Sequence, residues 1–138
     1  MANAQAVSVQ FKADSMGGIL NGAAQKAALF LASASKGATD TVYNTTGEVT
    51  GTNYTAGGVS VTNANTVAVT GTTAYWTPSA NIVYTNVTLS TAFDAVQIYR
   101  TSDSHLVGTW TFGSQTITAG TLTLTMPTND SSNALLRC

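Results

Sequence analysis

The chain has 138 residues, a length that fits one domain with its own hydrophobic core. Only 8% of its residues are charged, against roughly 25% in an average soluble protein, and the formal net charge is -1. Such a surface lacks the basic stripe that nucleic acids attract and the polybasic patch that anionic membranes attract, so we expect neither as a partner. No secretory signal or membrane-length apolar run is evident.

The N-terminal segment combines a short alternation with a weak helical pattern. Val7, Val9 and Phe11 alternate with polar residues, which predicts an extended arm over about residues 1–11. Apolar residues at near-helical spacing then predict one short helix somewhere in residues 12–24, although a pair of glycines weakens the pattern.

An apolar strand and a long loop follow. Residues 27–33 are a compact apolar run, which predicts the first core strand. Residues 34–58 are rich in glycine and hold two of the six acidic residues. Loops longer than about 15 residues inside a compact domain are usually functional or disordered, so we expect this loop to make contacts with a partner.

The second half of the chain alternates with a period of two, which is typical of strands. Residues 59–61 and 67–69 predict a hairpin or meander, and residues 73–77 predict a strand that stops before Pro78. Residues 82–89 fit either a strand or an extended loop.

The clearest strand pair comes next. Residues 93–99 and 106–112 predict adjacent antiparallel strands, and residues 116–118 and 122–126 complete the sheet. Residues 129–138 form a tail whose leucines can dock. The sum of about seven to nine short strands predicts a mainly β fold: an antiparallel β-sandwich or barrel with one short N-terminal helix, in a single domain over residues 1–138.

Residues with catalytic potential are few and scattered. The single histidine, His105, lies near Asp103, but no strained nucleophile turn accompanies the two, so a hairpin-turn pair is the simpler interpretation. The acids form no close pair, and the one cysteine is the terminal Cys138. We therefore expect no enzyme activity, no metal and no cofactor.

The aromatic residues divide between core and surface. Trp76, Tyr99 and Trp110 fit the core of a small β protein, most clearly Tyr99 and Trp110, which lie within predicted strands. Tyr43 and Tyr54, in the long loop, fit core and interface equally.

Between Glu48 and Asp94 the chain has no charged side chain. Isolated sheet proteins use lysines and inward-pointing charges to keep their strand edges from pairing with neighbours. Strands without such charges are expected to be covered by other subunits, so we expect a component of an assembly.

Four segments resemble small virion proteins of tailed bacteriophages, which are variously labelled capsid decoration, cement, head-fibre or tail proteins. They are Phe11–Asn21, the KAALFLASA strand, TTGEVTGTNYTAGGVSVTNA (Thr45–Ala64) and PTNDSSNALLR (Pro127–Arg137). The TGEVTGTNYTAGG part of the third segment is the most specific, and the resemblance covers nearly the whole chain, with residues 72–92 matching less well. The resemblance implies a β-rich protein present in many copies on the particle, with no catalytic residues.

We therefore expect a capsid cement or decoration protein on the virion exterior, made in the cytoplasm of the bacterial host. Its expected partners are the major capsid protein and copies of itself, as a dimer or trimer. Arms and loops commonly carry such contacts. The expected interface residues are Val7, Val9, Phe11, Tyr43, Glu48, Tyr54, Gly57 and Gly58.

Two alternatives remain open. The chain could be a tail, neck or surface-fibre component, which copy number per particle would distinguish. It could also be a carbohydrate-binding adhesion module on the virion. The aromatic residues that would stack on sugars are Tyr54, Tyr75, Trp76 and Tyr84.

Overall fold

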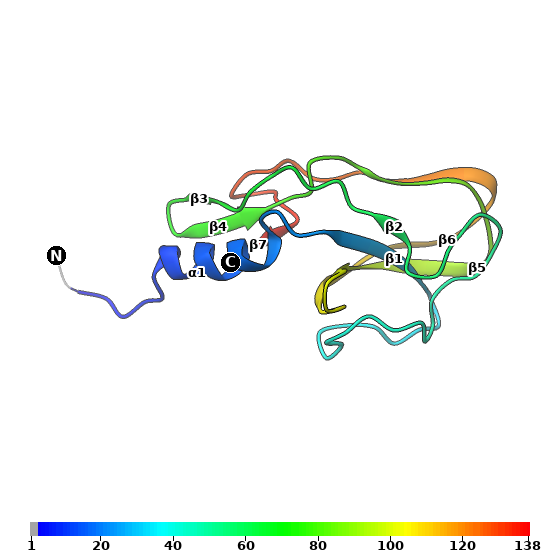
Figure 1. The fold of residues 1–138 in the computed structure, drawn as a ribbon, viewed down its shortest axis with the longest axis horizontal. Coiled ribbons are helices and arrows are strands. Elements are labelled where there is room, and N and C mark those ends of the chain that lie inside the picture. Colours follow the sequence, from blue (N-terminus) through cyan, green and yellow to red (C-terminus); the bar gives the residue numbers. More distant parts are fainter. Residues whose placement is uncertain (1–2) are drawn as a thin grey trace. The chain divides into compact units, whose positions relative to one another are not determined.

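The computed structural model describes residues 3–138 (Figure 1), and this part of the chain forms one helix and seven strands. The elements are α1 (Val9–Leu20), β1 (Gln25–Leu31), β2 (Val59–Ser60), β3 (Ala68–Thr70), β4 (Thr73–Trp76), β5 (Ile82–Arg100), β6 (Leu106–Leu124) and β7 (Leu136–Arg137). The fold is mainly β with two antiparallel sheets and a short helix, which confirms the predicted class.

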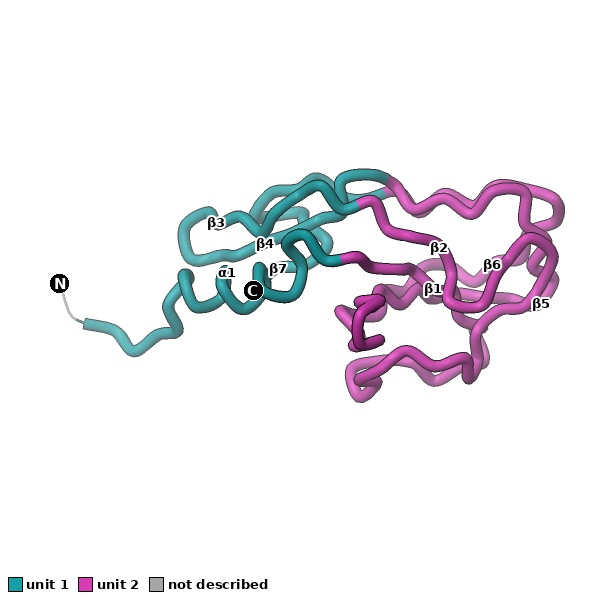
Figure 2. The backbone as a smooth tube through the Cα atoms, viewed as in Figure 1, with its two compact units in different colours: residues 1–23, 63–80, 126–138 teal, residues 24–62, 81–125 magenta. Residues whose placement is uncertain are grey.

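The chain forms two compact units (Figure 2). Unit 1 consists of the residues up to 23, residues 63–80 and residues 126–138, and unit 2 consists of residues 24–62 and 81–125. The chain passes repeatedly from one unit to the other, so no single point in the sequence separates them.

Helix α1 in unit 1 begins earlier than the sequence predicts. Ser8 caps its N-terminus, where the hydroxyl oxygen accepts a hydrogen bond of 3.2 Å from the N–H of Gln10. The helix ends at Leu20 because the backbone of Asn21 is extended (φ -68°, ψ 120°), and Gly22 follows at φ +69°. Met16 and Leu20 are buried. The predicted extended arm is therefore too long, since its last three residues, 9–11, are helical.

The sheet of unit 1 has the strand order β3-β4-β7. Trp76 on β4 is fully buried, and its indole N–H donates to the side-chain oxygen of Asn63 at 3.0 Å. The amide nitrogen of Asn63 donates to the carbonyl of Leu20 at 2.8 Å. The C-terminal tail docks as predicted, because Leu136 in β7 pairs with β4.

Unit 2 holds the sheet β2-β1-β5-β6, which is built on the long β5–β6 hairpin. The predicted antiparallel pair is confirmed, with a regular register from Ala95↔Thr111 to Ile98↔Gly108. Both strands are longer than predicted, and residues 82–89 are strand. Register shifts between Tyr84 and Ala95 interrupt the ladder. Bulges of this kind bend a strand, and in Figure 1 the hairpin curves along its length.

The predicted hairpin of residues 59–61 and 67–69 is wrong. β2 pairs with β1, whereas β3 pairs with β4 in the other sheet. The intervening asparagines bond elsewhere, and Asn65 donates to the carbonyl of Thr77 at 2.8 Å. Alternating polar and apolar residues show that a segment is a strand, but they do not show which strand it pairs with. For this reason the sequence predicts the wrong partner for residues 59–61.

The long loop is confirmed, since β1 ends at Leu31 and the next strand begins at Val59. It is tied to unit 2 by isolated antiparallel bridges at Glu48, Val42 and Thr52. One core cluster of this unit contains Ala28, Phe30, Ala95 and Tyr99, and the loop residue Tyr43 packs against it.

Candidate functional site

The long loop carries a buried carboxylate, Glu48, which is 7% exposed. The backbone on either side of it runs along β1. The N–H of Leu31 donates to the carbonyl of Gly47 at 2.9 Å, and the N–H of Val49 donates to the carbonyl of Leu29 at 3.1 Å. These bonds fix the position of the Glu48 side chain in unit 2.

Three donors converge on the Glu48 carboxylate. The hydroxyl of Tyr43 donates to Oε1. The hydroxyl of Tyr54 donates to Oε2 at 2.6 Å, and the backbone N–H of Gly57 donates to the same oxygen at 2.8 Å. Hydrogen bonds to an ionised group are stronger than neutral ones, and a buried charge is tolerated only when it is bonded in this way.

A second group of contacts surrounds these donors. The Tyr54 hydroxyl accepts from the N–H of Leu29 at 3.0 Å, and the Tyr99 hydroxyl donates to the carbonyl of Gly57 at 2.7 Å. The rings of Tyr43 and Tyr99 stack with centroids 4.4 Å apart, and those of Tyr54 and Tyr84 with centroids 6.0 Å apart. Four tyrosines therefore enclose one carboxylate.

Burial raises the pKa of Tyr54 and of Tyr84 well above the ordinary tyrosine value, and the neighbouring Glu48 carboxylate raises both further. The pKa of Tyr43 and of Tyr99 is raised by the same two causes. These hydroxyls therefore stay protonated at neutral pH and remain donors.

Two glycines let the chain close around this cluster. Gly57 has φ +98° and Gly58 has φ +80°, both in the left-handed region that favours glycine. A Cβ on Gly58 would lie 1.8 Å from the carbonyl oxygen of Ala27, so the loop backbone touches β1 where no side chain fits.

The structure thus brings together the five loop residues that the sequence singled out as an interface. Glu48 and Gly57 are buried, and Tyr43, Tyr54 and Gly58 are half-buried, so their polar groups face the chain's own interior. A general base must reach a substrate proton, but the Glu48 oxygens are already bonded to protein donors. The geometry therefore favours an anchor that fixes the loop, and contact of these residues with a partner stays a prediction.

The predicted N-terminal contact residues lie on the surface of unit 1. Val7 is 62% exposed and Phe11 is 66% exposed, whereas Val9 is half-buried. Ile19, two helical turns beyond Phe11, is also exposed. The sequence interpretation did not single out Ile19, although its spacing from Phe11 was a usable signal.

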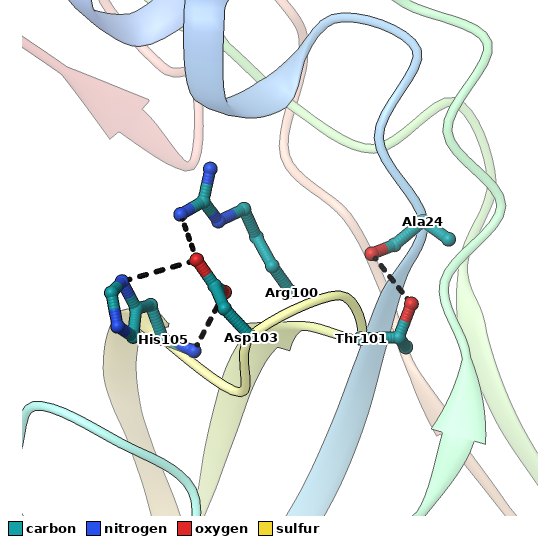
Figure 3. A network of polar contacts seen from close by, with 5 residues as sticks. All are labelled: Ala24, Arg100, Thr101, Asp103 and His105. Atoms are coloured by element: carbon teal, nitrogen blue, oxygen red, sulfur yellow. Dashed lines mark hydrogen bonds and ion pairs between the residues drawn. The ribbon is translucent and has the colours of Figure 1, made fainter.

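The single histidine sits in the β5–β6 turn (Figure 3). The Asp103 carboxylate is paired with Arg100, lies 3.2 Å from Nδ1 of His105, and accepts from the His105 backbone N–H at 3.1 Å. That backbone hydrogen bond, followed by the charge of Arg100, holds the pKa of Asp103 below its usual range. The contacts close a turn, as the sequence predicts. The hydroxyl and N–H of Thr101 bond the same turn to Ala24.

The sugar-stacking alternative loses two of its four aromatic residues. Trp76 is 0% exposed and Tyr84 is 1% exposed, so neither presents a ring face to a ligand. A hollow of about 530 Å³ in unit 2 lies between residues 36–40 and the start of β6, and no aromatic residue lines it.

Two other aromatic residues were predicted to lie in the core. Tyr99 is buried as predicted, and Trp110 is half-buried.

The sequence interpretation passed over the free edge of β6. β6 is an edge strand of 19 residues, and residues 106–124 contain neither charge nor proline. The sequence signal for this edge is a second uncharged run, over residues 106–124.

Comparisons with family models, curated proteins and solved structures gave no match. Within residues 3–138, no group of histidine, cysteine and acidic side chains is arranged to hold a metal ion. None of the helices described has the length and apolar character needed to cross a membrane.

Proposed function

We propose that this chain is a non-enzymatic bacteriophage structural protein that binds the assembled capsid shell as a cement or decoration protein. The observation that carries the proposal is the neutral β surface. The uncharged run between Glu48 and Asp94 includes β2, β3, β4 and half of β5, and β6 is uncharged throughout. Neutral threonine-rich surfaces can pack against neighbours without the desolvation cost of charges.

The resemblance of the Thr45–Ala64 block to phage virion proteins points to the same class. In this block the Glu48 cluster holds a loop whose outward side chains are small and polar, among them Thr50, Thr52 and Thr55. A loop fixed from within keeps one shape before binding, which lowers the entropy lost on association.

The mechanism follows from mass action. A protein that binds only the assembled shell shifts the equilibrium toward it, by an amount set by its concentration and affinity. Interface area buried between neighbouring capsid subunits supplies the affinity. The exposed Val7 and Phe11 are the proposed apolar contacts of unit 1.

Particles that lack the protein test the stabilising role. We expect them to break at a lower temperature, or in low salt, than particles to which the purified chain has been restored. Particles that withstand both equally well with and without the chain would refute the proposal.

A pair of lysine variants tests the contact surface. Phe11→Lys is expected to weaken shell binding at least about tenfold, because burying a phenylalanine side chain contributes roughly 1.5–3 kcal/mol. Gln10→Lys, also exposed in α1 but on a different side of the helix from Phe11, is the matched control and should bind like the wild type. Equal binding by the two variants would remove α1 from the interface.

A tail or neck position is the competing structural role. Copy number separates the two, because a shell protein is present in numbers comparable to the major capsid protein. A small fixed number of copies at one vertex would indicate the tail or neck instead.

A further inference from the structure

The free edge of β6 is unlike the other sheet edges of the described chain. The remaining edge strands are β2, β3 and β7, which are two or three residues long. Short edge strands are one way in which proteins prevent pairing with other chains, and charged side chains and proline are others. β6 has 19 residues and uses none of these devices.

The hydrogen bonds near the hairpin turn show which backbone groups point away from β5. The N–H of Leu106 donates to the carbonyl of Thr41, and the N–H of Tyr43 donates to the carbonyl of Ser104. The next carbonyl, that of His105, accepts from Arg100 in β5. The carbonyl of Ser104 and the N–H of Leu106 therefore face outward, whereas the N–H of Ser104 and the carbonyl of His105 bond to Arg100 in β5.

Antiparallel strands keep this alternation where the register is regular. The register shifts between the pairs Tyr99↔Leu106 and Ile98↔Gly108, and this bulge reverses the alternation. In the regular stretch that follows, the N–H and carbonyl of Gly108 and Trp110 face β5, whereas those of Thr109 and Thr111 face outward.

We infer that two copies of this chain pair edge to edge through residues 108–112 of β6, antiparallel about a two-fold axis beside residue 110. In this register Thr109 exchanges backbone hydrogen bonds with Thr111 of the second copy, and the symmetry repeats the pair. The regular ladder ends after Thr111, and residues 41–43 occupy the edge next to the turn, so the pairing is confined to this segment.

The side chains suit pairing with an identical strand. Thr109 of one copy lies opposite Thr111 of the other, and cross-strand threonine pairs are favourable. No charged side chain lies between residues 106 and 124, so no like charges meet, and Asp103 in the turn is already paired with Arg100 and His105.

The strength of the contact follows from its size. A five-residue strand pair is smaller than the roughly 800 Å² per partner of a stable interface, so we expect a dissociation constant on the order of 0.1 mM. The role of this pairing rests on the proposed function: copies held side by side on a shell have a high local concentration, at which a weak contact forms.

The experiment is sedimentation equilibrium of the Cys138→Ser chain, in which a disulfide dimer cannot form, from about 10 μM to about 1 mM. A monomer–dimer equilibrium is expected. Thr111→Lys should weaken it at least about tenfold, because an edge lysine opposes strand pairing. Thr123→Lys, at an exposed position of the same strand outside the segment, should stay within about twofold of the parent.

Hydrogen exchange at high and low protein concentration locates the contact. The amides of Thr109 and Thr111 are expected to exchange more slowly as the dimer forms, while that of Gly108, which faces β5, should not change. A chain that stays monomeric throughout the range would overturn the inference. So would a dimer that survives Thr111→Lys without protection at residues 109 and 111. Shells are absent from this experiment, so its failure would leave the cement proposal standing.

Discussion

The Glu48 cluster makes a quantitative prediction for Glu48→Ala. The substitution leaves three donors without their acceptor: the hydroxyls of Tyr43 and Tyr54 and the N–H of Gly57. An unsatisfied buried donor costs about 1–3 kcal/mol. Part of this is recovered, because a charge no longer has to be buried and Tyr43 is only half-buried. We expect the free energy of unfolding to fall by roughly 3–5 kcal/mol.

Glu48→Gln should cost less. The amide oxygen can accept from Tyr54 and Gly57, and the amide nitrogen can donate to the Tyr43 hydroxyl if that group turns to accept. The loss is then the difference between charged and neutral hydrogen bonds, about 1–2 kcal/mol. Asp14→Ala, which removes an exposed contact to Gln10, is the control and should change stability by less than about 0.5 kcal/mol.

The assay is urea unfolding with the slope m compared between variants, because a change in midpoint at constant m is a change in stability. A loss of about 3–5 kcal/mol is a large fraction of the 5–15 kcal/mol typical of a native protein. If Glu48→Ala unfolds within about 1 kcal/mol of the wild type, the carboxylate does not anchor the loop.

Three further outcomes are expected. Because the folded pKa values of Tyr54 and Tyr84 lie above the unfolded value of 10.0, both contribute stability that is complete below pH 10 and lost as pH rises beyond it. Tyrosinate absorbance and circular dichroism should therefore change together above pH 10; tyrosinate forming in a still-folded chain would contradict this. Gly58→Ala should destabilise by several kcal/mol or prevent folding, because its Cβ would overlap the Ala27 carbonyl; a soluble variant with wild-type urea midpoint would disprove the close approach. Trp76→Ala should cost about 3–5 kcal/mol through the cavity it leaves, and an unchanged melting temperature would place Trp76 outside the core.

The strands could be predicted from the sequence because alternation and turn residues are local signals. The pair of residues 93–99 and 106–112 was found for this reason, and so was the docking of the C-terminal tail. The helix start was misplaced because Ser8 acts as a cap, while the alternation of Val7, Val9 and Phe11 suggested an extended chain.

Strand partners could not be predicted, because they depend on contacts between distant segments. β2 and β3 lie close in the sequence but join different sheets. Residues 82–89 and 93–100 form one bent strand, since bulges absorb the irregular register between them.

The sequence identified the residues of the candidate site but not how they are arranged in space. Tyr43, Glu48, Tyr54 and the glycines stood out as unusual residues in a long polar loop. Their convergence on one carboxylate depends on the path of the loop along β1, for which the sequence holds no local signal. The buried state of Glu48 was therefore not foreseen.

The most direct test of the proposed role is cosedimentation of the purified chain with capsid shells that lack it. Assembled shells are compared with unassembled major capsid protein at the same subunit concentration. We predict saturable binding to the assembled shells, with a copy number comparable to that of the shell protein, and no binding to the free subunits. A chain that does not sediment with the shells, or that binds free subunits equally well, would contradict the account.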